Sequence, residues 1–134
     1  MWRGPKVARG AACGDFDNDG DVDLLITTNR GPAYLYRNDV TNGNRSLRLR
    51  LRGTKSNRDG IGAVVRLTTA DGTQLRMVRS GSSYLSQSEL ALTFGLGRRE
   101  RAERLVIAWP SGRVDEHGTM PAGRYECEEG AKPR

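Results

Sequence analysis

The stretch LRLRLR, Leu47 to Arg52, alternates leucine and arginine without exception. Successive side chains of a β-strand point to opposite faces, so the three leucines share one face and the three arginines share the other. One apolar and one charged face are typical of a strand in an antiparallel sheet that covers a core on one side and meets water on the other. The stretch therefore predicts a half-buried strand, and we expect its arginines to form an ordinary solvated face rather than a functional basic stripe.

The chain after this stretch has the same short-strand character. Asp71-Gly72 is a strong two-residue hairpin signal between two apolar segments. About seven strands with turn signals every 8–12 residues predict an all-β fold, either an antiparallel β-sandwich or a partly open barrel. The six further segments are IGAVVRLTT (61–69), TQLRMVRS (73–80), LALTFGL (90–96), LVIAW (105–109), RVDEH (113–117) and RYECE (124–128).

Two of these C-terminal features carry more detailed expectations. LVIAW is a nearly continuous apolar run, which is consistent with a strand buried on both faces. GAKPR, residues 130–134, ends the chain with small, polar and charged residues. Terminal residues of this kind are commonly poorly ordered, so we expect this tail to be frayed.

The stretch GDFDNDGDVDLL, Gly14 to Leu25, places aspartate at every second position. Like charges packed so closely repel one another unless a cation lies among them. Ca²⁺ takes six to eight oxygen ligands, which a short acidic loop with a sharp turn can supply. Taking the first aspartate as position 1, the predicted ligand set is the side chains of Asp15, Asp17, Asp19 and Asp23 at positions 1, 3, 5 and 9, with the backbone carbonyl of Asp21 at position 7.

The second half of this loop differs from an EF-hand. Position 12 of an EF-hand is a bidentate glutamate, whereas here it is Ile26. The residues around it, LLITT, are rich in β-branched side chains, so the loop is expected to lead into a strand. Asp23 must then supply the carboxylate that an EF-hand draws from position 12. The alternative is an acidic surface turn that holds no ion.

The 134-residue chain carries a net charge of +6. Setting aside the five clustered aspartates raises the net charge of the remainder to +11. A basic surface of this kind can attract nucleic acid, anionic lipid or acidic glycans, or simply keep a β-domain soluble. No nucleic-acid motif supports the first of these. The polyanion hypothesis rests on the clustering of Arg45, Arg48, Arg50, Arg52, Lys55 and Arg58.

The cysteines and the apolar content of the chain do not indicate one cellular compartment for the protein. Cys13 and Cys127 could form a disulfide that closes a loop of about a hundred residues, contributing about 4–5 kcal/mol in the chain-entropy model. They could equally be two unpaired buried thiols. The first residues contain no apolar segment typical of a signal peptide. No run approaches the length that spans a membrane, so no membrane span is expected.

Three other features have a functional and a structural interpretation. The single histidine, His117, lies near Asp115, which would allow an acid–base pair, but we expect an exposed or capping histidine and no enzyme. Tyr84 and Leu85 lie in the middle of the polar loop Ser80–Glu89, where they either bind a partner or fold back over the end of the sandwich. The loop Gly53–Gly60 either binds an anion through backbone N–H groups or simply connects two strands.

The stretch GDFDNDGDVDLLITTNRGPAYLYRND, Gly14 to Asp39, resembles one FG-GAP or VCBS repeat. Such repeats form β-propeller blades, as in the integrin α head, and hold calcium in the hairpin turn between two strands. The resemblance implies calcium ligands at Asp15, Asp17, Asp19, Asp21 and Asp23, and a following strand at AYLYRN, residues 33–38. A propeller needs about four to eight blades, and we find no second acidic loop, so a complete propeller is excluded.

The rest of the chain resembles the ASPIC and UnbV domain. The stretches that carry the resemblance are LRLRLRGTKSNRDGIGAVVRLTTADG, RSGSSYLSQSELALTFGLG and LVIAWPSGRV. In that family the domain follows a series of FG-GAP or VCBS repeats, usually in secreted or cell-surface proteins. The predicted organisation is a blade remnant with a calcium loop at residues 1–46 and a β-domain at residues 47–134. The blade remnant is expected to be an N-terminal β-hairpin.

These observations favour a non-enzymatic calcium-binding β-module, either structural or directed at an unidentified protein or glycan. The alternative is binding of polyanions by the basic surface, with nucleic acid the less expected ligand. A hydrolase that uses His117 comes third. A single blade leaves open strand edges. Its strands would then join the sandwich sheet or pair with a second copy in a homodimer, or the chain is a truncated product, and we favour the first two outcomes.

Overall fold

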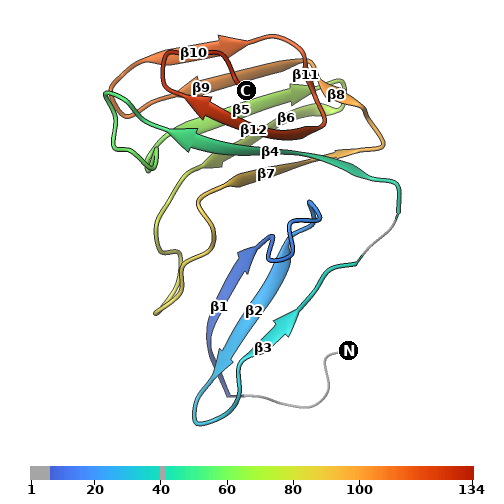
Figure 1. Cartoon of the computed structure of the whole chain (residues 1–134), viewed down its shortest axis with the longest axis vertical. Helices are drawn as coiled ribbons and strands as arrows, with labels where there is room; N and C mark the ends of the chain where they lie inside the picture. The colour runs from blue at the N-terminus through green and yellow to red at the C-terminus, as the bar shows by residue number, and fades with distance from the viewer. Residues whose placement is uncertain (1–6, 40–41) are drawn as a thin grey trace. The chain divides into compact units, whose positions relative to one another are not determined.

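The computed structural model describes residues 7–39 and 42–134, and the regular structure of these residues is entirely β (Figure 1). The predicted all-β class is confirmed. None of the described residues forms a helix of the length and apolarity needed to cross a membrane. The strands are β1 (Ala8–Gly14), β2 (Asp23–Thr28), β3 (Tyr34–Tyr36), β4 (Arg45–Arg52), β5 (Val64–Thr69), β6 (Gly72–Met77), β7 (Leu92–Gly97), β8 (Arg101–Ala102), β9 (Arg104–Ala108), β10 (Val114–His117), β11 (Met120–Pro121) and β12 (Gly123–Glu128).

The described residues divide into two compact units. The hairpin unit comprises residues 7–39 together with Ser80–Glu89, and the sandwich unit comprises residues 42–79 and 90–134. The loop Ser80–Glu89 therefore belongs to the first unit although it lies between two strands of the second.

The sandwich unit is built from two main sheets. One has the strand order β10-β9-β5-β6, the other has the order β12-β4-β7, and β8 and β11 form a short additional ribbon. Neither main sheet of the described residues closes into a barrel, which is consistent with the predicted β-sandwich. The hairpin signal at Asp71-Gly72 joins β5 to β6, as predicted, and pairs Thr69 with Gly72.

The core of the sandwich unit lies between the inner faces of these sheets. Leu47 and Leu49 of β4 are completely buried, and Leu51 is 5% exposed, so the alternation in LRLRLR places its leucines in the core as predicted. Phe94 of β7 is likewise completely buried. Other fully enclosed core side chains, each with an exposed fraction below 2%, are Val65, Leu67, Val78, Leu105, Ile107 and Cys127.

Two details of the sandwich differ from the expectations. β12 pairs in parallel with β4, with Tyr125 opposite Leu49, whereas the remaining pairings are antiparallel. LVIAW is buried on one face only, because its sheet packs against the second sheet on that side alone. Ile107 is completely buried, whereas Val106 is half-buried and Ala108 is exposed.

The C-terminal tail is held by hydrogen bonds, so the expectation that it is frayed is wrong. Gly130 N donates to the Asp115 carboxylate at 2.8 Å. Glu126 N donates to the Arg134 carbonyl at 2.8 Å, and Arg134 N donates back to the Glu126 carbonyl at 3.1 Å. These hydrogen bonds therefore hold in place a segment whose composition alone indicates disorder.

The hairpin unit is a three-stranded antiparallel meander in the order β1-β2-β3. β2 begins at Asp23, which confirms that the aspartate loop leads into a strand, and β3 lies within the predicted AYLYRN segment. These strands form a separate sheet, so the expectation that they join a sandwich sheet is wrong.

The loop Ser80–Glu89 occupies the outer edge of β1. Ala11 N donates to Ser86 Oγ at 3.1 Å, and Cys13 N donates to Ser88 Oγ at 3.0 Å. Glu89 N donates to the Cys13 carbonyl at 3.0 Å. The loop thereby takes the place of a neighbouring strand and satisfies edge groups that would otherwise be available for pairing. Dimerisation through open strand edges stays a prediction. The outer edge of β1 is not such an open edge, because the loop Ser80–Glu89 covers it.

Candidate functional site

The aspartate loop is the hairpin turn between β1 and β2. Gly14, the last residue of β1, pairs with Asp23, the first residue of β2. The intervening chain turns sharply at Asn18 and Gly20, whose φ angles are 63° and 105°. Asparagine and glycine adopt such left-handed conformations most readily, which explains why they interrupt the aspartates here.

Three aspartates of the loop converge. One carboxylate oxygen from each of Asp15, Asp17 and Asp19 lies within 4.8 Å of the others. Ca²⁺ binds oxygen at about 2.3–2.6 Å, so two ligands of one ion lie at most about 5 Å apart. The three side chains therefore have a spacing that one Ca²⁺ fits. Asp15 is buried, whereas Asp17 and Asp19 are exposed, which leaves room for water among the ligands.

Hydrogen bonds within the loop hold the carboxylates in place. Asp19 N donates to Asp17 Oδ1 at 3.3 Å, and Asp21 N donates to Asp19 Oδ1 at 2.9 Å. In these turns an aspartate side chain accepts from the backbone two residues further on. The alternation of aspartate in the sequence thus both supplies carboxylates and shapes the turn that presents them.

Asp23 closes the loop rather than joining this cluster. Asp23 as a residue is 2% exposed, and its carboxylate accepts Phe16 N–H on one oxygen and Asn38 N–H on the other, each at 2.8 Å. The backbone hydrogen bond from Asn38, and then that from Phe16, lower the pKa of Asp23, against the opposing effect of burial. Each oxygen keeps a second lone pair. Among the described residues the cluster holds three of the five predicted ligands, without Asp21 and Asp23.

Arg37 brings a positive charge close to the loop. Its Nε lies 3.8 Å from Asp17 Oδ2 and 2.6 Å from Asp39 Oδ1. The hydrogen bond from Asp39 raises the pKa of Arg37. One guanidinium shared with Asp39 offsets only part of the negative charge of the loop.

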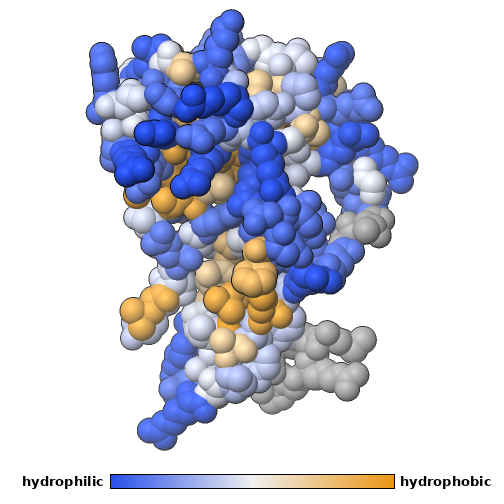
Figure 2. All heavy atoms as spheres, in the orientation of Figure 1, coloured by the Kyte–Doolittle hydropathy of each residue, from blue (hydrophilic) through white to orange (hydrophobic). Residues whose placement is uncertain are grey.

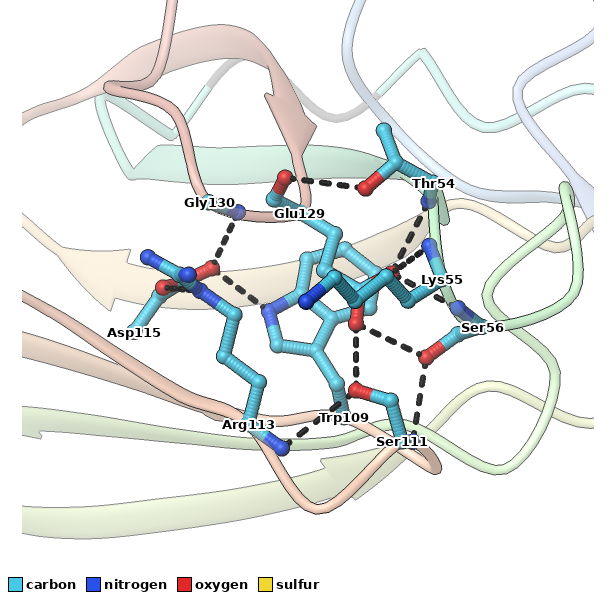
Figure 3. Close-up of polar contacts among 9 residues, drawn as sticks. All are labelled: Thr54, Lys55, Ser56, Trp109, Ser111, Arg113, Asp115, Glu129 and Gly130. Atoms are coloured by element: carbon cyan, nitrogen blue, oxygen red, sulfur yellow. Dashed lines mark hydrogen bonds and ion pairs between the residues drawn. The ribbon is translucent and has the colours of Figure 1, made fainter.

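The loop Gly53–Gly60 binds an anion through backbone N–H groups, and the anion is the chain's own Glu129 (Figure 3). The backbone N–H groups of Thr54, Lys55 and Ser56 each donate to Glu129 Oε2 at 2.8 Å. The Ser56 hydroxyl lies 3.1 Å from Oε1, which also accepts the Ser111 hydroxyl. Burial acts to raise the pKa of Glu129, but these hydrogen bonds outweigh it and lower the pKa to about 2.

Sequence reasoning did not identify Glu129 as the occupant of this loop. It follows directly after the predicted strand RYECE and immediately precedes the segment expected to fray. A glutamate at that place has no local pattern that distinguishes it from a surface residue. Only the parallel pairing of β12 with β4 brings it beside the loop that follows β4.

Asp115 is the second buried carboxylate of the sandwich unit. It accepts Trp109 Nε1–H and Gly130 N–H, each at 2.8 Å, and Arg113 Nε–H at 2.6 Å (Figure 3). Burial acts to raise its pKa, and the hydrogen bonds from Gly130, Arg113 and Trp109 bring the pKa below its usual range. Both carboxylate oxygens are thus engaged in structural contacts, which leaves the imagined acid–base pair with His117 without support.

The two cysteines are free, so no disulfide joins them. Cys127 is buried in the sandwich core, and this burial raises the pKa of its thiol to about 12. Cys13 is exposed on β1, which differs from the expectation of two buried thiols.

Tyr84 and Leu85 lie at the exposed tip of the loop Ser80–Glu89. Their exposed fractions are 71% and 87%, so neither side chain is covered as the structural interpretation expected. Leu85 also has a φ of 46°, a conformation that a leucine seldom adopts. The tip therefore presents two large side chains to solvent.

Charge is divided unevenly between the two units. The described residues of the hairpin unit carry seven acidic and three basic side chains, a net charge of −4, whereas those of the sandwich unit carry a net charge of +8. The arginines of LRLRLR do not form a uniform basic stripe. Arg52 lies 3.9 Å from Glu126 of the neighbouring strand β12.

The chain is similar to one protein family and to three curated proteins. The chain matches the ASPIC and UnbV family over residues 53–133. It is 36%, 35% and 34% identical over 109 residues to cartilage acidic protein 1 of Xenopus tropicalis, Mus musculus and Homo sapiens, respectively. That stretch is 78% of this chain but 16%, 17% and 16% of the three relatives. The chain thus spans about a sixth of the length of these curated relatives, and the aspartate loop lies outside the family match.

Proposed function

Because the chain belongs to the ASPIC and UnbV family, we propose that it is a non-enzymatic structural or interaction module of an extracellular-type protein, with one Ca²⁺ bound in the β1–β2 turn. The FG-GAP-like nature of that turn is part of the proposal. The cofactor is Ca²⁺, and the partner is a protein or glycan of unassigned identity.

The convergence of Asp15, Asp17 and Asp19 carries this proposal. Their carboxylate oxygens lie within 4.8 Å of one another, a spacing suited to one Ca²⁺ ion. The Asp21 carbonyl, the remaining lone pairs of Asp23 and water would complete a set of six to eight oxygens. Oxygen ligands of this kind favour a hard cation such as Ca²⁺ over Zn²⁺, which prefers nitrogen and sulfur.

Calcium bound here would stabilise the hairpin unit, because it would bind the folded turn but not the unfolded chain. Relief of the mutual repulsion of the three carboxylates would be one source of its affinity. The stabilisation is about 2.7 kcal/mol when free Ca²⁺ is a hundredfold above Kd. Because Asp15 follows β1 directly and Asp23 begins β2, the ion would fasten the two strands at one end.

Thermal melts test the calcium site. We expect a higher Tm in CaCl2 than in EGTA, and no such difference in an Asp15→Asn, Asp19→Asn double variant. Asp59→Asn is the matched control, because Asp59 is an exposed aspartate of the sandwich unit far from the loop in sequence. Equal Tm values for the unmodified protein in both buffers would contradict the proposal.

The engagement of the buried carboxylates supports a non-enzymatic role. Asp115 and Glu129 are the buried acidic residues of the sandwich unit, and both accept several structural hydrogen bonds. A general acid or base must instead reach a substrate proton. Unchanged stability and ligand binding in His117→Ala would agree with a histidine that carries no chemistry.

The charge of the sandwich unit favours a second candidate function. A net charge of +8 on its described residues would attract an acidic glycan. Binding driven by counterion release weakens steeply with salt. Retention on a heparin column beyond physiological salt would support this function, and elution below it would exclude a physiological role of this kind.

A further inference from the structure

The outer face of the β10-β9-β5-β6 sheet carries an apolar row that crosses all four strands. Four residues that pair in succession from β10 to β6 form this row: Val114, Ala108, Val64 and Met77. Side chains at paired positions lie on the same face of a sheet. The next residue along β5, Val65, is completely buried in the core, so the row lies on the opposite face, away from the core.

A second row lies beside the first, two residues along each strand. From β10 to β6 it consists of Glu116, Val106, Arg66 and Leu75. Large apolar side chains of both rows are open to solvent, since Val114 is 61% exposed, Leu75 is 63% exposed and Met77 is 48% exposed. We call these eight residues the outer apolar face, because six of them are apolar.

The outer apolar face departs from the usual surface of a sandwich. Outward-facing positions of such sheets are ordinarily polar. Hydrophilic side chains indeed dominate the side of the sandwich unit (β4–β12 in Figure 1) that Figure 2 shows. Six apolar residues that adjoin one another across four strands are typical of an interaction surface rather than of scattered exposed apolar side chains.

Arg66 places a positive charge within this apolar surface. It is exposed, it lies between Val106 and Leu75 on the neighbouring strands, and it forms no ion pair with any residue that the structure describes. The acidic residue of the same row, Glu116, is already paired with Arg104 at 2.7 Å. A partner that covers the two apolar neighbours of Arg66 would also cover its guanidinium, which is costly unless the partner supplies a carboxylate.

The size of the outer apolar face indicates a short occupant. Its four strands lie about 4.8 Å apart and its two rows about 6.8 Å apart, so it covers roughly 19 Å by 14 Å. This is roughly 260 Å², whereas a stable dimer usually buries about 800 Å² on each partner. One segment of a polypeptide therefore fits this face better than a second copy of the chain does.

We propose that the outer apolar face binds an extended segment of a partner polypeptide that carries apolar side chains followed by an acidic one. Alternate side chains of an extended segment lie about 6.8 Å apart, which is the spacing of Val64 and Arg66 along β5. An apolar side chain would lie on Val64 and Met77, and the carboxylate two residues further on would pair with Arg66. A basic side chain at that place would be repelled, and a wholly polar segment would leave the apolar rows in contact with water.

This inference rests on the proposed interaction role of the module and names the chemistry of the partner. It does not need the bound Ca²⁺, because the outer apolar face belongs to the sandwich unit and the aspartate cluster belongs to the hairpin unit. It also differs from the binding of an acidic glycan, which needs no apolar contact.

Amide NMR of the full ¹⁵N-labelled chain tests the proposal with the peptide Ac-Leu-Ser-Leu-Ser-Asp-Ser-NH2, titrated to about 10 mM. Matched peptides carry asparagine, which keeps the shape of aspartate without its charge, or lysine at the acidic position. Another peptide has serine in place of both leucines. The aspartate peptide should shift the amides of Val64, Arg66 and Leu75 and bind about threefold more tightly than the asparagine peptide, as expected for one exposed ion pair.

Several outcomes of this titration would overturn the proposal. Equal affinity of the aspartate and asparagine peptides would exclude the pairing with Arg66. Equal affinity of the aspartate peptide and the peptide without leucine would show that charge alone drives binding. Shifts confined to other residues, or no saturable shift up to 10 mM, would exclude binding at the outer apolar face.

Variants of the face provide the second arm of the test. Arg66→Gln should bring the aspartate and asparagine peptides to equal affinity, whereas Arg50→Gln, a matched exposed arginine of the other sheet, should preserve the difference. Met77→Thr should weaken both peptides. The effect of calcium on Tm should persist in Arg66→Gln, so failure of this site and failure of the calcium site give different results. An undiminished preference for aspartate in Arg66→Gln would contradict the proposal.

Discussion

Asp115→Ala should destabilise the sandwich unit by about 3–5 kcal/mol. The buried Asp115 carboxylate accepts two N–H groups, from the Trp109 indole and from Gly130, each at 2.8 Å, and it pairs with Arg113 at 2.6 Å. A hydrogen bond to a charged acceptor contributes about 1.5–3 kcal/mol, and breaking a buried ionic contact costs about 3–5 kcal/mol. The loss is large because the two N–H donors would remain with no acceptor in place.

Thermal unfolding followed by circular dichroism measures this loss. For a chain of this size we expect Tm to fall by about 10–20 °C. Glu116→Ala is the matched control, because Glu116 is the next residue of β10 but is exposed and pairs with Arg104 on the neighbouring strand at 2.7 Å. Its Tm should change by less than about 2 °C.

A double-mutant cycle separates the indole contact from general effects of truncation. Trp109→Phe removes the N–H donor but keeps an aromatic ring in the core. The effects of the two substitutions on the free energy of unfolding should be coupled by about 1.5–3 kcal/mol, since each substitution breaks the same hydrogen bond. Equal Tm values for Asp115→Ala and Glu116→Ala, or additive effects of Asp115→Ala and Trp109→Phe, would refute the reasoning.

Three further predictions address other parts of the fold. The pKa of Glu129 in the folded protein, about 2, lies below its ordinary value, so its stabilising contribution should be complete above about pH 5 and be lost as the pH falls toward 2. Urea midpoints across this range should therefore fall less steeply in Glu129→Gln than in the unmodified protein. Ellman's reagent should modify Cys13 at once and Cys127 only after unfolding, because burial raises the pKa of the Cys127 thiol to about 12. Gly60→Ala should lower Tm, since Gly60 has a φ of 63° and its added Cβ would come within 2.9 Å of a core side chain, whereas Gly95→Ala on open surface should leave Tm nearly unchanged.

Local patterns predicted the strands and their buried faces well. LRLRLR placed Leu47 and Leu49 in the core because a period of two depends only on strand geometry. Asp71-Gly72 located a hairpin because the turn type needs those residues. The aspartate spacing correctly indicated a loop that leads into a strand, since both signals lie within a dozen residues.

Contacts between residues distant in the sequence were not predictable in this way. The partner of the Gly53–Gly60 loop is Glu129, which lies 75 positions from Thr54. The tail that looked frayed is fixed by Asp115, and the serines of the loop Ser80–Glu89 cap the edge of β1. Each of these contacts depends on the order of strands in the sheets, which composition and periodicity do not encode.

The aspartate cluster itself was predicted in part. The sequence named five ligands, and Asp15, Asp17 and Asp19 converge, while the Asp23 carboxylate accepts backbone N–H groups from Phe16 and Asn38. Alternation of aspartate cannot show which carboxylates converge and which, like that of Asp23, lie outside the cluster. That division depends on hydrogen bonds formed only after β1, β2 and the chain beyond β3 are in place.

Calcium titration of the full ¹⁵N-labelled chain, followed by amide NMR, tests the proposed calcium site most directly. We predict that the amides of residues 15–23 shift together and saturate at one ion per chain, while those of β4 and β9 stay unchanged. Extracellular calcium modules bind with Kd of about 10⁻⁴–10⁻³ M, so the titration should extend to about 10 mM. The absence of a saturable shift in residues 15–23 over that range would contradict the proposed calcium site.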